Sequence, residues 1–276
     1  MQKLIILHTN DLHGRIENLT RIATEVDRIR VENDDKDILY VDAGDSQDTS
    51  NLLSDLSKGV AMHTLLRVAG CQATTLGNKC MRQYRMGVVV RYAEAMGSPL
   101  LLANLPMPDG NPIVGTVPSK LFELGELKLG MISVSTKRAT YVRYHRLKVL
   151  PAMEAIRREI TSLRSQGANA IIILSHMGVF EDQKLAKALQ EDVPLIIGGH
   201  THYLLENGQK MGTAYVVQAD SYGDYLGRVD MEWDGDTLTV EKCGVMPITN
   251  DIPPAPRMLE AIELITAEVQ QHWNEH

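Results

Sequence analysis

Short apolar runs alternate along the chain with longer stretches in which apolar residues recur at helical spacing. The first run, Ile5–Leu7, is too short to cross a membrane, and residues 38–41, 171–174 and 196–197 form similar runs. Between the runs, residues 19–31, 59–69, 88–95 and 151–165 carry apolar side chains every three or four positions, which is typical of amphipathic helices. Short strands that alternate with helices predict an α/β fold.

Some segments break this alternation of strands and helices, one in the middle of the chain and others after residue 214. Residues 121–134 read as a hairpin that turns near Gly125, and residues 215–218, 225–233 and 238–243 read as further strands, so we expect antiparallel pairing there. A proline-rich break at residues 253–256 precedes a helix over residues 259–273. Its apolar stripe is Leu259, Ile262, Ile265, Val269 and Trp273. We expect this stripe to pack on the protein's own core; a dimer or partner surface is the alternative.

Potential metal ligands follow these four apolar runs and a fifth strand-like run, Thr75–Gly77, which precedes Asn78. The ligands are Asp11, His13, Asp45, Asn78, His176, His200 and His202. A single Asp-x-His motif is more often a solvated turn. However, open α/β sheets bind ligands at the carboxyl ends of their strands, so five such ends predict one shared metal site.

The ligand types indicate which metals and which chemistry the site supports. Carboxylate, amide and imidazole donors suit Mn, Fe, Zn or Co. One ion rarely needs seven ligands, whereas two ions about 4 Å apart with a bridging carboxylate would use them all. Such a pair activates a bridging water and clamps phosphate oxygens, so the ligands alone predict phosphoester hydrolysis.

Composition narrows the alternatives. The 276 residues are 44% hydrophobic and 23% charged, and the net charge is -7. An acidic chain is a poor nucleic-acid-binding protein, and an anionic substrate would need local cations such as bound metal. The three cysteines, Cys71, Cys80 and Cys243, form no C-x-x-C pair and predict reduced thiols. With no signal peptide or membrane-spanning run in view, we expect a cytoplasmic protein without membrane association.

The order of the motifs resembles a known family. Asp-x-His, Gly-Asp, Gly-Asn, Ser-His and Gly-Gly-His-Thr-His succeed one another, as in the calcineurin-like metallophosphoesterases. Within that superfamily, His8–Gly14 and Val217–Arg228 resemble the catalytic domain of the 5′-nucleotidase and 2′,3′-cyclic phosphodiesterase family.

The resemblance implies a four-layer αββα sandwich of two mixed sheets. It also implies that Asp11, His13, Asp45 and His202 hold one metal ion. Asp45, Asn78, His176 and His200 would hold the second, with Asp45 as the bridge and a metal-bridging hydroxide as the nucleophile. Residues 1–250 would form the catalytic domain and residues 251–276 a linker and helix, without the family's C-terminal substrate domain.

One motif departs from the family. The third motif normally contains a His that contacts the phosphoryl group, with an acidic residue three positions later; here these positions are Lys79 and Arg82. Lys79 could contact phosphate as a point charge. Alternatively, catalysis is weakened or suits a leaving group that needs no protonation, or His63 or His145 replaces the missing His.

The sequence thus predicts a dinuclear metal-dependent phosphoesterase for nucleotides or related small phosphoesters. The alternative is a catalytically weakened relative that binds a phosphorylated ligand. No nucleic-acid partner is expected, and a homodimer is left open.

Overall fold

The computed structural model describes residues 1–274 and contains two main sheets. The first has the order β13-β12-β1-β2-β3. Its strands are β1 (Gln2–Thr9), β2 (Asp37–Asp42), β3 (Ala73–Thr74), β12 (Tyr225–Trp233) and β13 (Leu238–Pro247). Strands β1, β2 and β3 are parallel, whereas β12 and β13 pair antiparallel, so this sheet is mixed.

The second sheet has the order β10-β11-β9-β8-β7-β6. Its strands are β6 (Ser119–Leu124), β7 (Leu127–Ser135), β8 (Ala170–His176), β9 (Leu195–Ile197), β10 (Gln209–Met211) and β11 (Ala214–Val217). Strands β7, β8, β9 and β11 are parallel, and a hairpin at each edge adds one antiparallel strand. Two short strands, β4 (Leu100–Leu101) and β5 (Thr116–Val117), pair separately.

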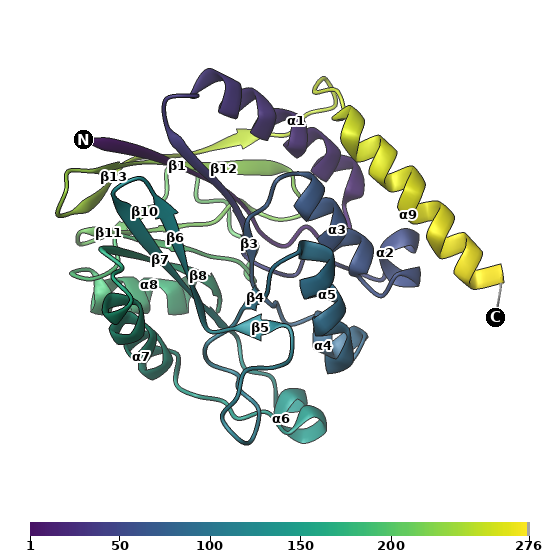
Figure 1. The fold of residues 1–276 in the computed structure, drawn as a ribbon, viewed down its shortest axis with the longest axis horizontal. Coiled ribbons are helices and arrows are strands. Elements are labelled where there is room, and N and C mark those ends of the chain that lie inside the picture. The colour runs from purple at the N-terminus through teal and green to yellow at the C-terminus, as the bar shows by residue number, and fades with distance from the viewer. Residues whose placement is uncertain (275–276) are drawn as a thin grey trace.

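Helices cover the outer faces of the sheets (Figure 1). They are α1 (Ile16–Glu32), α2 (Leu52–Leu56), α3 (Val60–Val68), α4 (Cys80–Gln83), η1 (Met86–Val88), α5 (Val89–Met96), α6 (Ala139–His145), α7 (Ala152–Ser165), α8 (Val179–Leu189) and α9 (Pro256–Asn274). Helices α1, α3, α5 and α9 lie on the side of the first sheet, and α7 and α8 lie on the side of the second.

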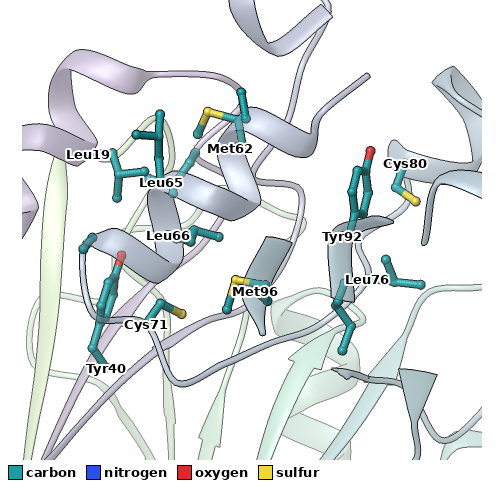
Figure 2. Close-up of a cluster of buried hydrophobic side chains, with 14 of the residues drawn as sticks. Leu19, Tyr40, Met62, Leu65, Leu66, Cys71, Leu76, Cys80, Tyr92 and Met96 are labelled. Atoms are coloured by element: carbon teal, nitrogen blue, oxygen red, sulfur yellow. The ribbon is translucent and has the colours of Figure 1, made fainter. Parts of the chain in front are cut away.

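The layers follow from the two-residue period of the strands. In β1, Leu4 and Ile6 face the core between the two sheets, while Ile5 and Leu7 face the helices of the first layer. In β8, Ile172 faces the same inter-sheet core, whereas neighbouring Ile173 faces α7 and α8. The central strands of both sheets are therefore buried on both faces, which explains their nearly continuous apolar runs. The result is the predicted four-layer αββα sandwich, and Figure 2 shows part of its first helical core.

Most predicted elements are confirmed, with small shifts at their ends. The hairpin near Gly125 forms between β6 and β7, and the expected helix after Pro151 begins at Ala152. The strand expected before Asn78 ends at Thr74, so Asn78 lies in the loop that follows it. Helix α6 was not predicted, because the run from Arg138 to Lys148 is rich in cations and has no apolar period.

Helix α9 packs on the first helical layer, as expected. Met258 and Ile265 are buried, and Ile262 and Val269 are partly buried against the same core. Leu259 of the predicted stripe is exposed instead, and the side chain of Trp273 lies outside the described residues. Among residues 1–274, no helix has the length and apolar character required to cross a bilayer.

Candidate metal centre

The predicted ligands meet at the carboxyl ends of β1, β2, β8 and β9. Two groups of donor atoms form there, each within 4.8 Å. One contains Asp11, His13 and His202, and the other contains Asp11, Asp45 and His176. Five of the seven predicted ligands are thus gathered around one carboxylate, although they are spread over most of the chain.

The Oδ1 atom of Asp11 lies at the centre of both groups. It is 3.3 Å from Nε2 of His202 and 3.9 Å from Nε2 of His176. Its other oxygen, Oδ2, accepts hydrogen bonds from the side-chain amide of Asn10 (2.9 Å) and from the backbone N–H of His200 (2.7 Å). One oxygen is therefore held by the protein while the other is left to face the histidines.

The second carboxylate, Asp45, is held in a similar way. Its Oδ1 accepts the backbone N–H of Lys79 at 2.8 Å, and its Oδ2 lies 3.3 Å from Nε2 of His176. The Nδ1 atom of His176 donates to the carbonyl of Ala43 at 2.7 Å, which leaves Nε2 directed at the two carboxylates.

The remaining two predicted ligands border this group. The ring of His200 lies 5.2 Å from that of His176 between centroids. Asn78 is buried, and its Oδ1 accepts a hydrogen bond from Nη2 of Arg138 at 2.9 Å. An amide oxygen has two lone pairs, so this contact leaves Asn78 Oδ1 one further acceptor position.

Backbone conformation aims the ligands into the site. Five predicted ligands have positive φ angles: Asp11, His13, Asp45, His200 and His202, at 50°, 46°, 54°, 80° and 55°. Such angles are uncommon for residues other than glycine and cost of order 1–3 kcal/mol each. Their concentration here indicates that the fold holds strained loops in order to direct these side chains together.

The local electrostatics also suit a cation. Burial alone would raise the pKa of Asp11, but the charge of His176 and the nearby imidazoles of His13 and His202 hold this pKa well below its usual range. Burial would likewise lower the pKa of His176, yet Asp45 and Asp11 raise it to about 9. Asp11 Oδ1, His13 Nδ1 and His176 Nε2 are buried without a hydrogen-bond partner. A divalent cation between these carboxylates and imidazoles would satisfy Asp11 Oδ1 and His176 Nε2, so the residues fit a metal ion.

Lys79 reaches the edge of this centre, whereas Arg82 is exposed to solvent. Nζ of Lys79 forms an ion pair with the carboxylate of Asp48, and Oδ2 of Asp48 lies 3.7 Å from Nδ1 of His13. The pKa of Asp48 is lowered, against the effect of burial, by its hydrogen bond with Lys79. Arg82 lies on α4 and is exposed.

Neither histidine that might have replaced the family His occupies that position. His63 is buried in the helical layer, where it stacks on Tyr92 with ring centroids 3.8 Å apart. Nε2 of His145 instead bonds the carbonyl of Met81 at 3.1 Å.

Three features of the site were missed from the sequence. Arg138 and Asp48 are reached only through tertiary contacts, and nothing in their local motifs marks them. The third is a pair of exposed aromatic rings, Phe180 and Tyr203, with centroids 6.0 Å apart. The available signal was their position next to two ligand motifs: Phe180 lies two residues after Ser-His-Met-Gly, and Tyr203 directly follows Gly-Gly-His-Thr-His.

Comparison with known proteins identifies the family. The sequence model of the family described as "Calcineurin-like phosphoesterase" matches residues 4–204. The chain belongs to the calcineurin-like phosphoesterases. Membership in this family of phosphoester hydrolases accounts for the order of the five motifs and for the sandwich of two mixed sheets.

Individual relatives resemble the chain over most of its length. It is 31% identical over 243 residues to the uncharacterized metallophosphoesterase YunD of Bacillus subtilis, covering 84% of this chain and 51% of that protein. It is 28% identical to a snake venom 5′-nucleotidase of Gloydius brevicauda, and the match covers 88% of this chain and 47% of that protein. The chain thus spans about half the length of these curated relatives.

The same fold occurs in a solved structure, the 5′-nucleotidase precursor of Thermus thermophilus. It superposes with a TM-score of 0.81 over 98% of this chain and 59% of that chain, at 22% identity. At this identity the likeness concerns the fold alone.

Proposed function

We propose that the protein is a dinuclear metal-dependent phosphoesterase that hydrolyses nucleotides or related small phosphoesters. The observation that carries this proposal is the Asp11 carboxylate, whose Oδ1 lies between two separate donor groups that also contain His202 and His176. When bound, two divalent ions would activate a water and neutralise the charge that develops on phosphate oxygens.

Each ion would have its own ligands. Asp11, His13 and His202 would hold one, and His176, His200 and Asn78 would hold the other with Asp45. The family resemblance assigns the bridging role to Asp45. The central position of Asp11 Oδ1 makes Asp11 a second candidate for that role.

The protein's own residues would orient the substrate. The Lys79 ammonium, which pairs with Asp48 at the edge of the centre, would contact a phosphate oxygen as a point charge. The carboxylates of Asp11 and Asp45 are fixed by backbone N–H groups of His200 and Lys79, which limits their movement during a displacement at phosphorus.

Two observations favour a substrate that contains a nucleoside group. The snake venom relative is a 5′-nucleotidase by name. In addition, the exposed rings of Phe180 and Tyr203 follow His176 and His202 closely in sequence, and exposed aromatic faces of this kind stack on bases.

The principal experiment is reconstitution with metal. Protein stripped of metal and supplied with Mn²⁺ is assayed against p-nitrophenyl phosphate, bis-p-nitrophenyl phosphate, 5′-nucleotides and 2′,3′-cyclic nucleotides, with Asp45→Ala as the control. We expect about two equivalents of Mn²⁺ and turnover that is lost in the control. Metal binding without turnover of any ester would contradict the enzyme and favour a ligand-binding role.

The second candidate, a weakened relative that binds a phosphorylated ligand, is motivated by Lys79 and Arg82. The double variant Lys79→His and Arg82→Asp restores the family's residue types and separates the two candidates. A large gain in phosphomonoesterase turnover would support the weakened relative. A loss would indicate that Lys79 itself contributes to catalysis, as we propose.

A further inference from the structure

A basic surface lies beside the candidate metal centre of this acidic protein. It is formed by Arg82 and Arg85, and by four cations in and next to α6, all exposed: Lys137, Arg138, Arg143 and Arg146. We call these six residues the basic rim. The sequence has no Asp or Glu between Asp55 and Glu94, nor between Glu126 and Glu154, so both segments lack acidic residues of their own.

Acidic groups from neighbouring elements do not neutralise the rim. Asp48 pairs with Lys79, and Asp55 accepts a hydrogen bond from the hydroxyl of Tyr84 at 3.2 Å. Within residues 1–274, none of the six rim cations forms an ion pair with a carboxylate. The rim is therefore a concentration of uncompensated positive charge on a chain whose net charge is -7.

The two halves of the rim meet at the predicted ligand Asn78. Arg138 donates to Asn78 Oδ1 at 2.9 Å, and the hydroxyl of Tyr141 donates to the Asn78 carbonyl at 2.9 Å. On the next turn, Nε2 of His145 bonds the carbonyl of Met81, which fixes α6 against α4. Helix α6 thus begins at the metal centre and leads away from it. At 1.5 Å per residue, Arg143 lies about 7 Å further along than Arg138.

We propose that the basic rim binds a second phosphate group of the substrate, separated from the scissile phosphate by at least a sugar. The inference rests on the proposed phosphoesterase function and names its preferred substrate class as bisphosphorylated. Guanidinium groups match phosphate oxygens with paired N–H donors, and an exposed cation without a carboxylate partner gives up no ion pair when it binds. The rim also offsets the protein's negative field, which would otherwise repel a polyanion.

A ligand with two phosphate groups could come from two sources. A small nucleoside bisphosphate carries both phosphates on one sugar, whereas the end of a single-stranded nucleic acid presents the second phosphate on the next nucleotide. Both would place one phosphate at the metal centre and one on the rim, and they differ in whether further nucleotides add affinity.

The test is equilibrium binding by calorimetry, in EDTA and at low ionic strength, so that no ester is hydrolysed. The probes are adenosine 5′-monophosphate, adenosine 3′,5′-bisphosphate and 5′-phosphorylated tetrathymidylate. We expect the bisphosphate to bind at least tenfold more tightly than the monophosphate, and 0.3 M NaCl to remove most of this preference.

The Arg143→Glu/Arg146→Glu variant should lose the preference while its affinity for the monophosphate changes less than twofold. The matched control, Arg157→Glu/Lys187→Glu, makes the same charge change at exposed positions of α7 and α8. It should keep the preference for the bisphosphate. Equal affinities of the wild type for monophosphate and bisphosphate, or no bisphosphate binding, would overturn the proposal. So would equal losses in both double variants.

The remaining outcomes identify the source of the phosphate. Tetrathymidylate that binds more tightly than the bisphosphate indicates the end of a nucleic acid, and weaker binding indicates a small bisphosphate. Because binding is measured without metal, a preserved preference in a protein that hydrolyses no ester with Mn²⁺ would refute the phosphoesterase and leave the rim assignment intact.

Discussion

The ammonium of Lys79 and the carboxylate of Asp48 form an ion pair at the edge of the candidate metal centre. Lys79 immediately precedes α4, and Asp48 lies in the loop after β2. Asp48 Oδ2 is also 3.7 Å from Nδ1 of the predicted ligand His13. Asp48 therefore links Lys79 of the third motif to His13 of the first. Lys79 thus has an acidic partner, although Arg82 replaces the family's acidic residue.

This arrangement predicts a positioning role for Asp48. In Asp48→Asn, Lys79 loses its ionic partner and its ammonium is free to move. We expect kcat/KM for phosphomonoesters to fall about tenfold, as is typical when a group that orients a ligand or contact residue is removed. Manganese stoichiometry should stay unchanged, because Asp48 is not one of the predicted metal ligands. Asp55→Asn, which removes an exposed carboxylate bonded to Tyr84, is the matched control and should stay within twofold. Equal effects of the two variants would contradict the role.

The fold could be predicted largely from the sequence because its strands are buried on both faces. Ile171 to Leu174, for example, face alternately the helices and the inter-sheet core, so the whole run must be apolar. Most of the predicted ligands could be found in the same way, because Asp11, Asp45, His176 and His200 lie at or shortly after the ends of such runs, whereas Asn78 follows only the two-residue strand β3. Helix α6 could not be predicted, since it is short and cationic and has no hydrophobic period. Hydrogen bonds from Tyr141 and His145 hold it in place instead.

The contacts between motifs could not be predicted in the same way. Arg138 and Asn78 are sixty residues apart, and Lys79 and Asp48 are thirty-one apart. Nothing in either local sequence specifies the partner, because a salt bridge or hydrogen bond between loops depends on how the strands that carry them are registered.

The glycine before Asn78 should be essential to the centre. A Cβ atom on Gly77 would overlap Oδ1 of Asp45 and lie 2.5 Å from the Asp45 backbone nitrogen. Gly77→Ala must therefore displace Asp45. A displacement of about 1 Å at a reacting centre costs on the order of 100-fold in rate, so we expect turnover to fall by at least that factor.

Gly87→Ala provides the control for this prediction, since a Cβ there meets no atom within 4 Å. Turnover and bound Mn²⁺ are measured for both variants, with circular dichroism to establish that each is folded. Full activity in a folded Gly77→Ala protein would show that Asp45 can move without consequence, against its predicted role as a ligand.

Helix α9 should stabilise the protein through one face only. Ile265 is 9% exposed and packs on the first helical layer, whereas the adjacent Leu264 is 69% exposed. We expect Ile265→Ala to lower the free energy of unfolding by about 2–4 kcal/mol. Leu264→Ala should change it by less than about 0.5 kcal/mol. Urea unfolding measures both, and a larger loss for Leu264→Ala would indicate that a partner covers the outer face of α9.

Acid should destabilise the protein through buried neutral histidines, and His63 offers the clearest case. Burial lowers the pKa of His63 to about 4, and its Nδ1 lies 3.0 Å from the carbonyl oxygen of Gly59, to which the neutral ring donates. In the unfolded chain the pKa returns to about 6.5, so the unfolded state binds the proton first as the pH falls. Stability due to the neutral ring is therefore present above about pH 6.5 and is lost progressively down to about pH 4.

The variant His63→Phe keeps a ring against Tyr92 but cannot titrate. Its free energy of unfolding should be lower at pH 7, because the hydrogen bond to Gly59 is lost. Between pH 7 and pH 5, however, the wild type should lose about 2 kcal/mol more than the variant. His8, with a pKa of about 4, and Asp42 and Asp182, with pKa values raised by burial to about 6 and about 7, are common to both proteins. Their contributions therefore cancel when the two proteins are compared. The free energy of unfolding is measured by urea unfolding at each pH. If it falls equally with pH in both proteins, His63 is not held neutral by the core.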